Sequence, residues 1–223
     1  ARGPVNGSWP SPRGRPAATA RLRARPEDFQ VEEIPLYEPT GSGGFLWLWV
    51  EKRGRNTQDV VSDLARGLDL RSRDVGYAGR KDRHAVTRQA FTVPESVEAR
   101  LGDLDGDGAL EGARILAVEK TDHRLRTGQL LGNRFRLTVR ELEAGSQDEI
   151  QRRFDHLASR GMPNRYGDQR FGRDGRNVER GREVLASPKL RGDRRRAWLM
   201  VSALQSAVFN EVLKRRPYNQ LLP

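Results

Sequence analysis

Residues 45–52 read FLWLWVEK, the cleanest alternation of side chains in the chain. Phe45, Trp47 and Trp49 share one face of the expected strand, and the residues that alternate with them, up to Val50, share the other. Because both faces are apolar, we expect this strand at the centre of a sheet that is covered on both sides. A sheet with covering helices is therefore the first element of the fold.

The segments on either side of this strand extend the same pattern. Upstream, a strand is expected around Phe29 and Val31, interrupted at Pro26. Downstream, Asn56 or Thr57 can cap a helix. That helix carries apolar residues at helical spacing, namely Val60, Val61, Leu64 and Leu68. Further strands are expected around residues 75–79, over 87–93, over 113–120 and over 134–140.

The last of these strands, RFRLTVR, pairs apolar and basic positions. Alternation predicts that Phe135, Leu137 and Val139 point inward. The arginines between them, Arg134, Arg136 and Arg140, are then expected to point outward. A basic outer face is usually a solvated face, although in this chain it is also a candidate for contact with phosphates.

Helices dominate the rest of the chain. Ser146 and Glu149 form a capping-box pattern for a helix that ends at Gly161. Two more helices are expected over about 177–186 and 195–216, the second stopped by Pro217. Strands first and helices later predict an α+β organisation. We expect a disordered leader (residues 1–20), one domain over 21–160 and a second over 161–223.

Composition excludes several classes of protein. The chain has 223 residues, with 35% hydrophobic and 32% charged, enough to bury a core. No run approaches the roughly 18 apolar residues of a membrane span, so an integral membrane protein is excluded. Cys is absent and the three His are widely spaced, which argues against disulfide scaffolds, thiolate sites and His-rich metal centres. We expect a cytoplasmic protein.

The positive charge is concentrated in the last third of the chain. Lys and Arg number 41 against 30 Asp and Glu, a net charge of +11. Residues 1–150 have a net charge of only +1, whereas residues 151–223 carry 17 basic and 7 acidic residues, a net charge of +10. A GC-rich genome explains a preference for Arg over Lys but not this distribution. The asymmetry indicates a polyanionic partner, and Arg suits phosphate because its planar fork binds two oxygens.

The segment GRKDR, residues 79–83, is the first candidate for chemistry. Asp82 stands there among three adjacent cations, in a loop expected between two strands. Nearby positive charge favours an ionised carboxylate. Taken alone, the segment is more typical of a surface salt bridge.

Three other segments are candidates for binding. Phe29 follows the turn PED, where it is typical of a core residue. Asn133 lies in GNRF, where its amide can bond a base edge or cap a turn. Residues 164–172, NRYGDQRFG, interleave arginines with aromatic residues, as in surfaces that stack on bases and contact phosphates. The same composition also suits a packed, structured loop.

Known motifs narrow the chemistry further. The Gly/Asp loop around residues 103–108 resembles a calcium loop, but its twelfth position, which needs a bidentate Glu, is Arg114. A Walker A loop, GxGxxG, HExxH and a serine-hydrolase elbow are all missing from the sequence. What remains is chemistry that one carboxylate can perform on a nucleic acid without a metal or a cofactor. A carboxylate-based metal nuclease is a weaker reading, since no acidic cluster stands outside that loop.

Five ordered segments resemble the TruD family of tRNA pseudouridine synthases. They are PEDFQVEEI (26–34), FLWLWVEKRGRNT (45–57), GYAGRKDRHAVTRQ (76–89), GNRFRLTVR (132–140) and GMPNRYGDQRFG (161–172). The third is highly specific, and all five stand in family order from about residue 22 to about residue 210. The resemblance implies a catalytic domain with a mixed, mostly antiparallel sheet flanked by helices. It also implies an inserted, basic, family-specific α/β domain that begins near residue 160.

The resemblance also implies functional residues. Asp82 matches the catalytic aspartate of the family. Phe29, Asn133 and Phe135 match positions that contact the target nucleoside. Lys81 lies in the same motif as Asp82, where it is expected to orient it or to neutralise charge.

The implied activity is the isomerisation of uridine to pseudouridine in tRNA, at position 13 in bacterial members. The implied enzyme is a monomer that needs neither metal nor cofactor. Arg165, Arg170 and Arg173 of the basic segment are expected to bind the RNA. The alternative is a catalytically inactive RNA-binding fragment that uses the same basic surface.

One departure from the family concerns length. The family continues beyond its second domain back into the catalytic sheet, and its C-terminal part supplies another active-site aromatic. This sequence ends at RPYNQLLP. We therefore expect it to be a fragment of a longer protein.

Overall fold

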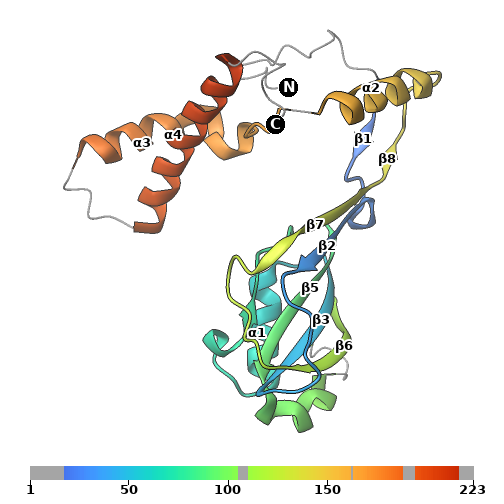
Figure 1. Cartoon of the computed structure of the whole chain (residues 1–223), viewed down its shortest axis with the longest axis vertical. Helices are drawn as coiled ribbons and strands as arrows, with labels where there is room; N and C mark the ends of the chain where they lie inside the picture. The colour runs from blue at the N-terminus through green and yellow to red at the C-terminus, as the bar shows by residue number, and fades with distance from the viewer. Residues whose placement is uncertain (1–17, 105–109, 162, 188–193, 216–223) are drawn as a thin grey trace. The chain divides into compact units, whose positions relative to one another are not determined.

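The computed structural model describes residues 18–104, 110–161, 163–187 and 194–215. The chain forms two compact units, one of residues 19–143 and one of residues 144–223 together with 1–18. We call them the sheet unit and the helical unit and describe each by itself (Figure 1). Most of the expected leader and the centre of the Gly/Asp loop lie outside the described residues.

The sheet unit is built on a six-stranded sheet with the order β6-β3-β5-β2-β7, in which the short β4 also pairs with β5. A separate two-stranded ribbon joins β1 to β8. The strands are β1 (Arg21–Leu22), β2 (Phe29–Pro35), β3 (Phe45–Arg53), β4 (Gly76–Tyr77), β5 (Val86–Pro94), β6 (Ala113–Thr121), β7 (Leu130–Leu137) and β8 (Val139–Arg140). Short 3-10 helices cover Pro26–Asp28, Ser72–Asp74 and Glu95–Leu104.

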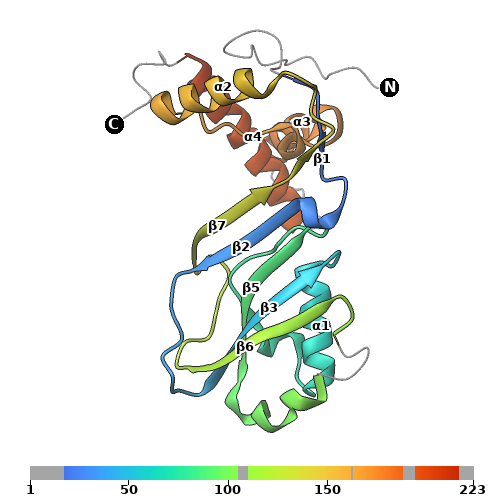
Figure 2. The same ribbon diagram turned by 90° about the vertical axis from the view of Figure 1, so that its right-hand side faces the viewer.

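The sheet is mixed and mostly antiparallel, as the sequence predicts. Only β2 and β5 run parallel among the described strand pairs, with Val31 opposite Thr87. β3 lies between β6 and β5 and pairs with both along nearly its whole length, so FLWLWVEK forms a central strand as expected. Figure 2 shows this arrangement of the strands.

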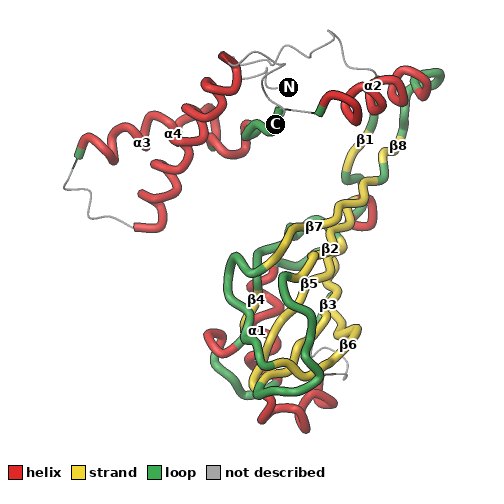
Figure 3. Tube along the Cα trace, in the orientation of Figure 1, coloured by secondary structure: helices red, strands yellow, loops and turns green. Residues whose placement is uncertain are grey.

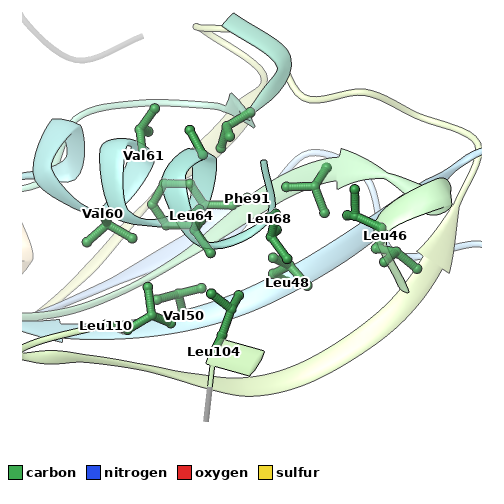
Figure 4. Packing of buried hydrophobic residues seen from close by; sticks show 14 residues of the cluster. Leu46, Leu48, Val50, Val60, Val61, Leu64, Leu68, Phe91, Leu104 and Leu110 are labelled. Atoms are coloured by element: carbon green, nitrogen blue, oxygen red, sulfur yellow. The ribbon is translucent and has the colours of Figure 1, made fainter. Parts of the chain in front are cut away.

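Helix α1 (Thr57–Gly67) covers one face of the sheet and closes the main core. It begins after Asn56, whose backbone N–H donates to the Asp59 carboxylate at 3.0 Å. Its buried apolar residues pack on those of β3 and β5, as Figure 4 shows. The core consists of Leu46, Leu48, Val50, Val60, Val61, Leu64, Ala65, Leu68, Val75, Phe91, Val93, Val97, Leu104 and Leu110. All four apolar positions that indicated this helix are buried.

The opposite face of the sheet has a smaller apolar cluster. The rings of Trp47 and Trp49 stack with centroids 5.4 Å apart and an interplanar angle of 3°. Trp47 is buried against Ala90 of β5 and Leu125 of the loop that precedes β7. β3 is therefore covered on both faces, which is what its two apolar faces predicted.

The prediction for residues 134–140 is wrong in two respects. The expected strand is divided between β7 and β8, so Val139 lies in the separate ribbon and not in the six-stranded sheet. Phe135 and Leu137 share a face of β7, but both are about half exposed, with Phe135 at 55%. β7 is the last strand of the sheet, and no described element of the sheet unit covers that face beside it. Alternation sets which side chains lie together. Whether something packs on them is decided by where the strand falls in the sheet.

The helical unit contains α2 (Gln147–Arg160), α3 (Arg176–Ala186) and α4 (Arg194–Arg215), joined in part by 3-10 turns at Asp168–Phe171 and Arg173–Gly175. Figure 3 shows α3 crossing α4. At the crossing, a side chain on Gly181 would clash with the backbone of Met200. The three helices were expected from the sequence. The two compact units meet between Glu143 and Ala144, so α2 belongs to the helical unit. The domain boundary expected near residue 160 stays a prediction.

Candidate functional site

The loop between β4 and β5, residues 78–85, carries the candidate catalytic residue. Asp82 and its neighbours Arg83 and His84 are exposed, whereas Lys81 and Ala85 on either side are buried. The loop therefore presents one short exposed turn from a buried base. Its start lies beside the approach to β7, since Gly128 N–H donates to the carbonyl of Ala78 at 2.7 Å.

An internal ion pair fixes the base of this loop. Lys81 Nζ contacts the carboxylate of Glu33 on β2, and both side chains are almost fully buried. The same carboxylate accepts a hydrogen bond from the backbone N–H of Ala90 at 3.3 Å. Lys81 thus faces the protein interior and joins the loop to β2.

Two buried polar side chains attach the loop to α1 and β5. Thr57 Oγ1 accepts from the backbone N–H of Lys81 at 2.9 Å and donates to Gln89 Oε1 at 2.9 Å. The amide nitrogen of Gln89 donates to the carbonyl of Gly79 at 3.0 Å. The N-terminus of α1, the loop and β5 are therefore linked through a continuous hydrogen-bond network.

A second buried lysine contacts the loop at Asp82 itself. Lys52, at the end of β3, is 1% exposed. Its ammonium donates to the carbonyl oxygens of Arg55 at 2.7 Å and Asp82 at 2.8 Å. Burial lowers the pKa of Lys52 to about 8, an effect that the charge of Asp82 partly opposes and that of Lys81 reinforces.

Two aromatic side chains, one on β2 and one on β7, lie on the sheet face that also carries Glu33 and Lys52. Phe29 is 4% exposed and its ring lies parallel to that of Phe135, with centroids 6.0 Å apart and an interplanar angle of 5°. The guanidinium of Arg23 lies 4.0 Å from the centre of the Phe29 ring. Phe135 leaves its outer surface open, which makes it the available stacking surface of this pair.

Asn133 on β7 lies beside the buried ion pair and two residues from Phe135. It is directly opposite Glu33 in the register of β2 and β7, and Phe135 is opposite Val31. The side-chain oxygen of Asn133 is buried and has no hydrogen-bond partner in the described structure. Because a buried acceptor without a partner is costly, this atom is suited to receive a donor from a ligand.

A turn held by an arginine positions the aromatic residues. Arg140 of β8 binds Asp28 through both carboxylate oxygens, at 2.9 Å from Nε and 2.7 Å from its terminal nitrogen. This bond holds the pKa of the Asp28 carboxyl below its usual value. The PED turn is thereby fixed directly before Phe29.

Comparison with known proteins shows to which family the chain belongs. The family model for tRNA pseudouridine synthase D (TruD) matches residues 14–187. The chain belongs to the TruD family. A tRNA pseudouridine synthase D from Anaeromyxobacter sp. (strain Fw109-5) is 44% identical over 207 residues, which are 90% of this chain and 57% of that protein.

A second relative is similar in sequence, and a solved structure shares the fold. The tRNA pseudouridine synthase D of Methylococcus capsulatus is 42% identical over 93% of this chain and 58% of its own length. The crystal structure of a putative TruD protein from Methanosarcina mazei shares the fold, with a TM-score of 0.63 at 24% identity, over 90% of this chain and 49% of that one. The chain spans less than two thirds of the length of these relatives.

The structure links the candidate site residues of the sheet unit through a series of neighbouring positions. Asp82 follows Lys81, which contacts Glu33, and Glu33 lies opposite Asn133. Phe29 and Phe135 continue along the same two strands. Segments that are far apart in the sequence therefore meet on one face of the sheet.

The candidate RNA-binding segment of the helical unit is a packed loop in the part that the structure describes. Arg170 donates from Nε to Ser206 at 3.0 Å and from a terminal nitrogen to Ser202, both on α4. The backbone of Tyr166 exchanges hydrogen bonds with the Asn210 side chain at 3.0 and 2.9 Å. Contact of Arg165 and Arg170 with RNA stays a prediction, and the side chain of Arg173 lies outside the described residues.

Several outward arginines of the sheet are paired with glutamates. On the face opposite α1, Arg88 binds Glu51 at 2.8 Å and Arg134 lies 3.4 Å from Glu32. Arg114 also binds Glu51, at 2.8 Å. This face carries a ladder of opposite charges, as an ordinary solvated sheet surface does. It is therefore not a concentrated positive surface for phosphates.

Sequence reasoning missed the buried polar residues behind the loop. Glu33 and Lys52 are charged residues at inward positions, in line with Phe29 and Val31 on β2 and with Val50 on β3. A charge on the apolar side of an alternating strand is the signal that identifies them, because such a residue must find an internal partner. The partners themselves come from other strands and cannot be read from the pattern.

The described residues contain neither a candidate metal site nor a membrane span. No group of three or more His, Asp or Glu side chains is placed to hold a metal ion among them. None of the helices that the structure describes is long and apolar enough to cross a membrane.

Proposed function

We propose that this chain forms the part of a tRNA pseudouridine synthase that carries the catalytic carboxylate, Asp82. The proposal rests on three features that lie near one another in the sheet unit. An exposed aspartate stands on a loop anchored by buried polar contacts, on the sheet face that also carries an aromatic pair and an unpartnered amide oxygen. Membership of the TruD family supplies the reaction class, the isomerisation of uridine in tRNA.

The proposed chemistry moves uracil on its own ribose. The bond between N1 and C1′ breaks, the base turns, and C5 bonds to C1′ and loses its proton, while N1 gains a proton. The Asp82 carboxylate can start the reaction by attacking C1′ or by removing a proton from C2′. Phe29 and Phe135 supply an apolar wall that keeps the detached base in place and limits water. The Asn133 oxygen can accept a hydrogen bond from an N–H of the base.

The target uridine must leave its stack before it reaches Asp82. Flipping a nucleotide out of folded RNA costs a few kcal/mol, which the protein offsets with stacking and phosphate contacts. We assign much of the phosphate contact to the segment 151–223, with its net charge of +10. In the TruD scheme this segment would belong to the inserted domain, and position 13 of tRNA would be the target.

Replacement of Asp82 by Asn tests the catalytic role. This substitution keeps the shape of the side chain but removes its charge and basicity, so neither route remains available. The assay measures pseudouridine in unmodified tRNA, for the 223-residue chain and for a chimera that adds the part of the Anaeromyxobacter relative that this chain does not match. We expect turnover in the parent, no detectable pseudouridine in Asp82→Asn, and unchanged tRNA affinity.

The same variant separates catalysis from a surface salt bridge. If Asp82 were only a surface charge, Asp82→Asn would keep its activity and lose a little thermal stability. A matched control is Asp122→Asn, which changes an exposed aspartate in the loop between β6 and β7. Substantial activity in Asp82→Asn, or no pseudouridine from either parent form, would contradict the proposal.

A further inference from the structure

We propose that Lys52 is a positioning residue of the active site, which holds the main chain at Asp82 and so sets where the carboxylate is presented. The inference rests on the proposed function for its catalytic consequence. The hydrogen bond of Lys52 to the Asp82 backbone is seen in the structure and does not depend on the proposed function. Lys52 is almost fully buried, and its ammonium donates to two backbone carbonyls that lie outside the sheet, those of Arg55 and Asp82.

The hydrogen bonds of Lys52 connect the segment before α1 with the loop that carries Asp82. One goes to the carbonyl of Arg55, just before α1, at 2.7 Å, and the other to the carbonyl of Asp82 at 2.8 Å. Lys52 itself is fixed on β3, where it pairs with Thr87 of β5. A single ammonium therefore sets the distance between the central strand, the start of α1 and the catalytic residue.

The loop has other anchors on both sides of Asp82, and after it the backbone N–H of Gly54 donates to the carbonyl of Ala85 at 3.2 Å. Thr57 holds the backbone of Lys81, and Gln89 holds that of Gly79. Lys52 is the described side chain that bonds the backbone of Asp82 itself. Loss of this bond should loosen the exposed turn and leave its base in place.

The charge of Lys52 adds to this role. The ammonium of Lys81 is matched by the buried carboxylate of Glu33. Among the described residues, Lys52 donates to two carbonyl oxygens and forms no ion pair, and Asp82 is the acidic group with the largest influence on it. A buried cation without its own carboxylate attracts the Asp82 side chain toward the face where the aromatic pair lies. We expect this attraction to narrow the range of positions that the carboxylate takes.

Replacement of Lys52 by Met removes the charge and the donor and keeps the length of the side chain. Misplacing a reacting group by about 1 Å costs up to about 100-fold in rate. We therefore expect kcat for pseudouridine formation to fall about 10- to 100-fold in Lys52→Met, with KM for tRNA close to that of the parent. Lys52→Arg, which restores a charged donor, should recover part of the loss.

A second measurement does not depend on activity. Hydrogen exchange of the peptide 80–84 should become about tenfold faster in Lys52→Met, because a bond worth about 1.4 kcal/mol or more holds this turn. Exchange of β5 residues 89–93 should stay as in the parent. Lys120→Met is the matched control, since Lys120 lies on the same sheet and pairs with Glu95 and Glu98 at the surface. It should change neither readout.

The outcomes separate this proposal from the proposed function. Unchanged exchange over residues 80–84, or a fall in activity no greater than that of Lys120→Met, would overturn the role of Lys52 whatever Asp82 does. If the parent forms no pseudouridine, the exchange result alone decides. If Lys52→Met does not fold, Lys52→Gln, which keeps one amide donor, takes its place in both measurements.

Discussion

The two units of the chain differ in which side chains they bury. The sheet unit buries two lysines beside an apolar core, whereas the helical unit leaves large apolar side chains of α4 exposed. In the sheet unit, Lys52 and Lys81 are buried and bonded, and the apolar core is closed under α1. In the helical unit, Trp198 is 70% exposed and Val208 57% exposed on α4, while Ser202 and Ser206 of the same helix are buried and bind Arg170. The sheet unit thus has an internal network of its own. In the helical unit, contacts between elements include the hydrogen bonds of Arg170 to α4 and the close crossing of α3 and α4 at Gly181.

The largest effect should come from breaking the buried ion pair of the sheet unit. Lys81→Met leaves the carboxylate of Glu33 buried without its cation, which typically costs about 3–5 kcal/mol. The matched change in the helical unit is Arg153→Met, which removes an i,i+4 bond to Glu149 at 2.7 Å on α2. That pair should be worth less than about 1 kcal/mol. Urea unfolding of both variants measures the loss in the free energy of unfolding. Equal losses would show that the ion pair of the sheet unit is worth no more than that of the helical unit.

Core truncation should distinguish the units almost as strongly. Leu64→Ala removes a fully buried side chain of α1 and should cost about 2–5 kcal/mol. Val208→Ala removes a largely exposed side chain of α4 and should change the free energy of unfolding by less than about 0.5 kcal/mol. Thermal denaturation with both variants provides the test. A large loss from Val208→Ala would mean that this surface of α4 is covered in solution.

Alkaline pH should act on the sheet unit through Lys52. Its pKa is about 8 in the folded chain against 10.5 for an ordinary lysine, because burial penalises the charge. Between these values the unfolded chain keeps a proton that the folded chain has lost, so the free energy of unfolding rises with pH, by up to about 3 kcal/mol. Unfolding of the parent and of Lys52→Met is compared at about pH 7.5 and about pH 10, on either side of most of this rise. The rise should be missing in the variant, and identical slopes would contradict the assignment.

The helix crossing gives the converse test on the helical unit. Gly181→Ala places a methyl group against the backbone of Met200, so α3 and α4 must separate. Overpacking of this kind costs about 1–3 kcal/mol. Exchange protection should fall in α3 and α4 and stay unchanged in β3 and β5. Gly175→Ala is not a suitable control, since Gly175 has a φ of +73°; Ala186→Gly at the exposed end of α3 is one.

The smallest expected effect concerns RNA affinity. Arg176 and Arg180 are exposed on α3 and should contribute to phosphate binding, although Arg176 lies 3.9 Å from the carboxylate of Asp174. On the sheet, Arg88 binds Glu51 at 2.8 Å and Arg134 lies 3.4 Å from Glu32. Arg176→Glu with Arg180→Glu should weaken tRNA binding and flatten its dependence on salt, by about 0.7–0.9 in the logarithmic slope for each phosphate that is no longer neutralised. Arg88→Gln should leave that slope unchanged. Equal slopes for all variants would remove the helical unit from the RNA interface.

The sequence by itself determined the local elements and the functional residues to search for. Alternation at residues 45–52 predicted a central strand and helical spacing from Val60 to Leu68 predicted a covering helix, because side-chain periodicity reflects which face is buried. The motif around Asp82 and the family resemblance identified the candidate site. Confirmation that these residues act in catalysis remains with the experiments above.

Only the tertiary structure decided how these residues are held and covered. The parallel pairing of β2 with β5 places Glu33 beside Lys81, and the end of β3 places Lys52 under Asp82, although these residues come from separate segments. The edge position of β7 leaves Phe135 exposed where alternation predicted an inward side chain. Periodicity is a property of one strand. Ion pairs, covered faces and anchored loops depend on strand order and register, which arise when distant segments pack together.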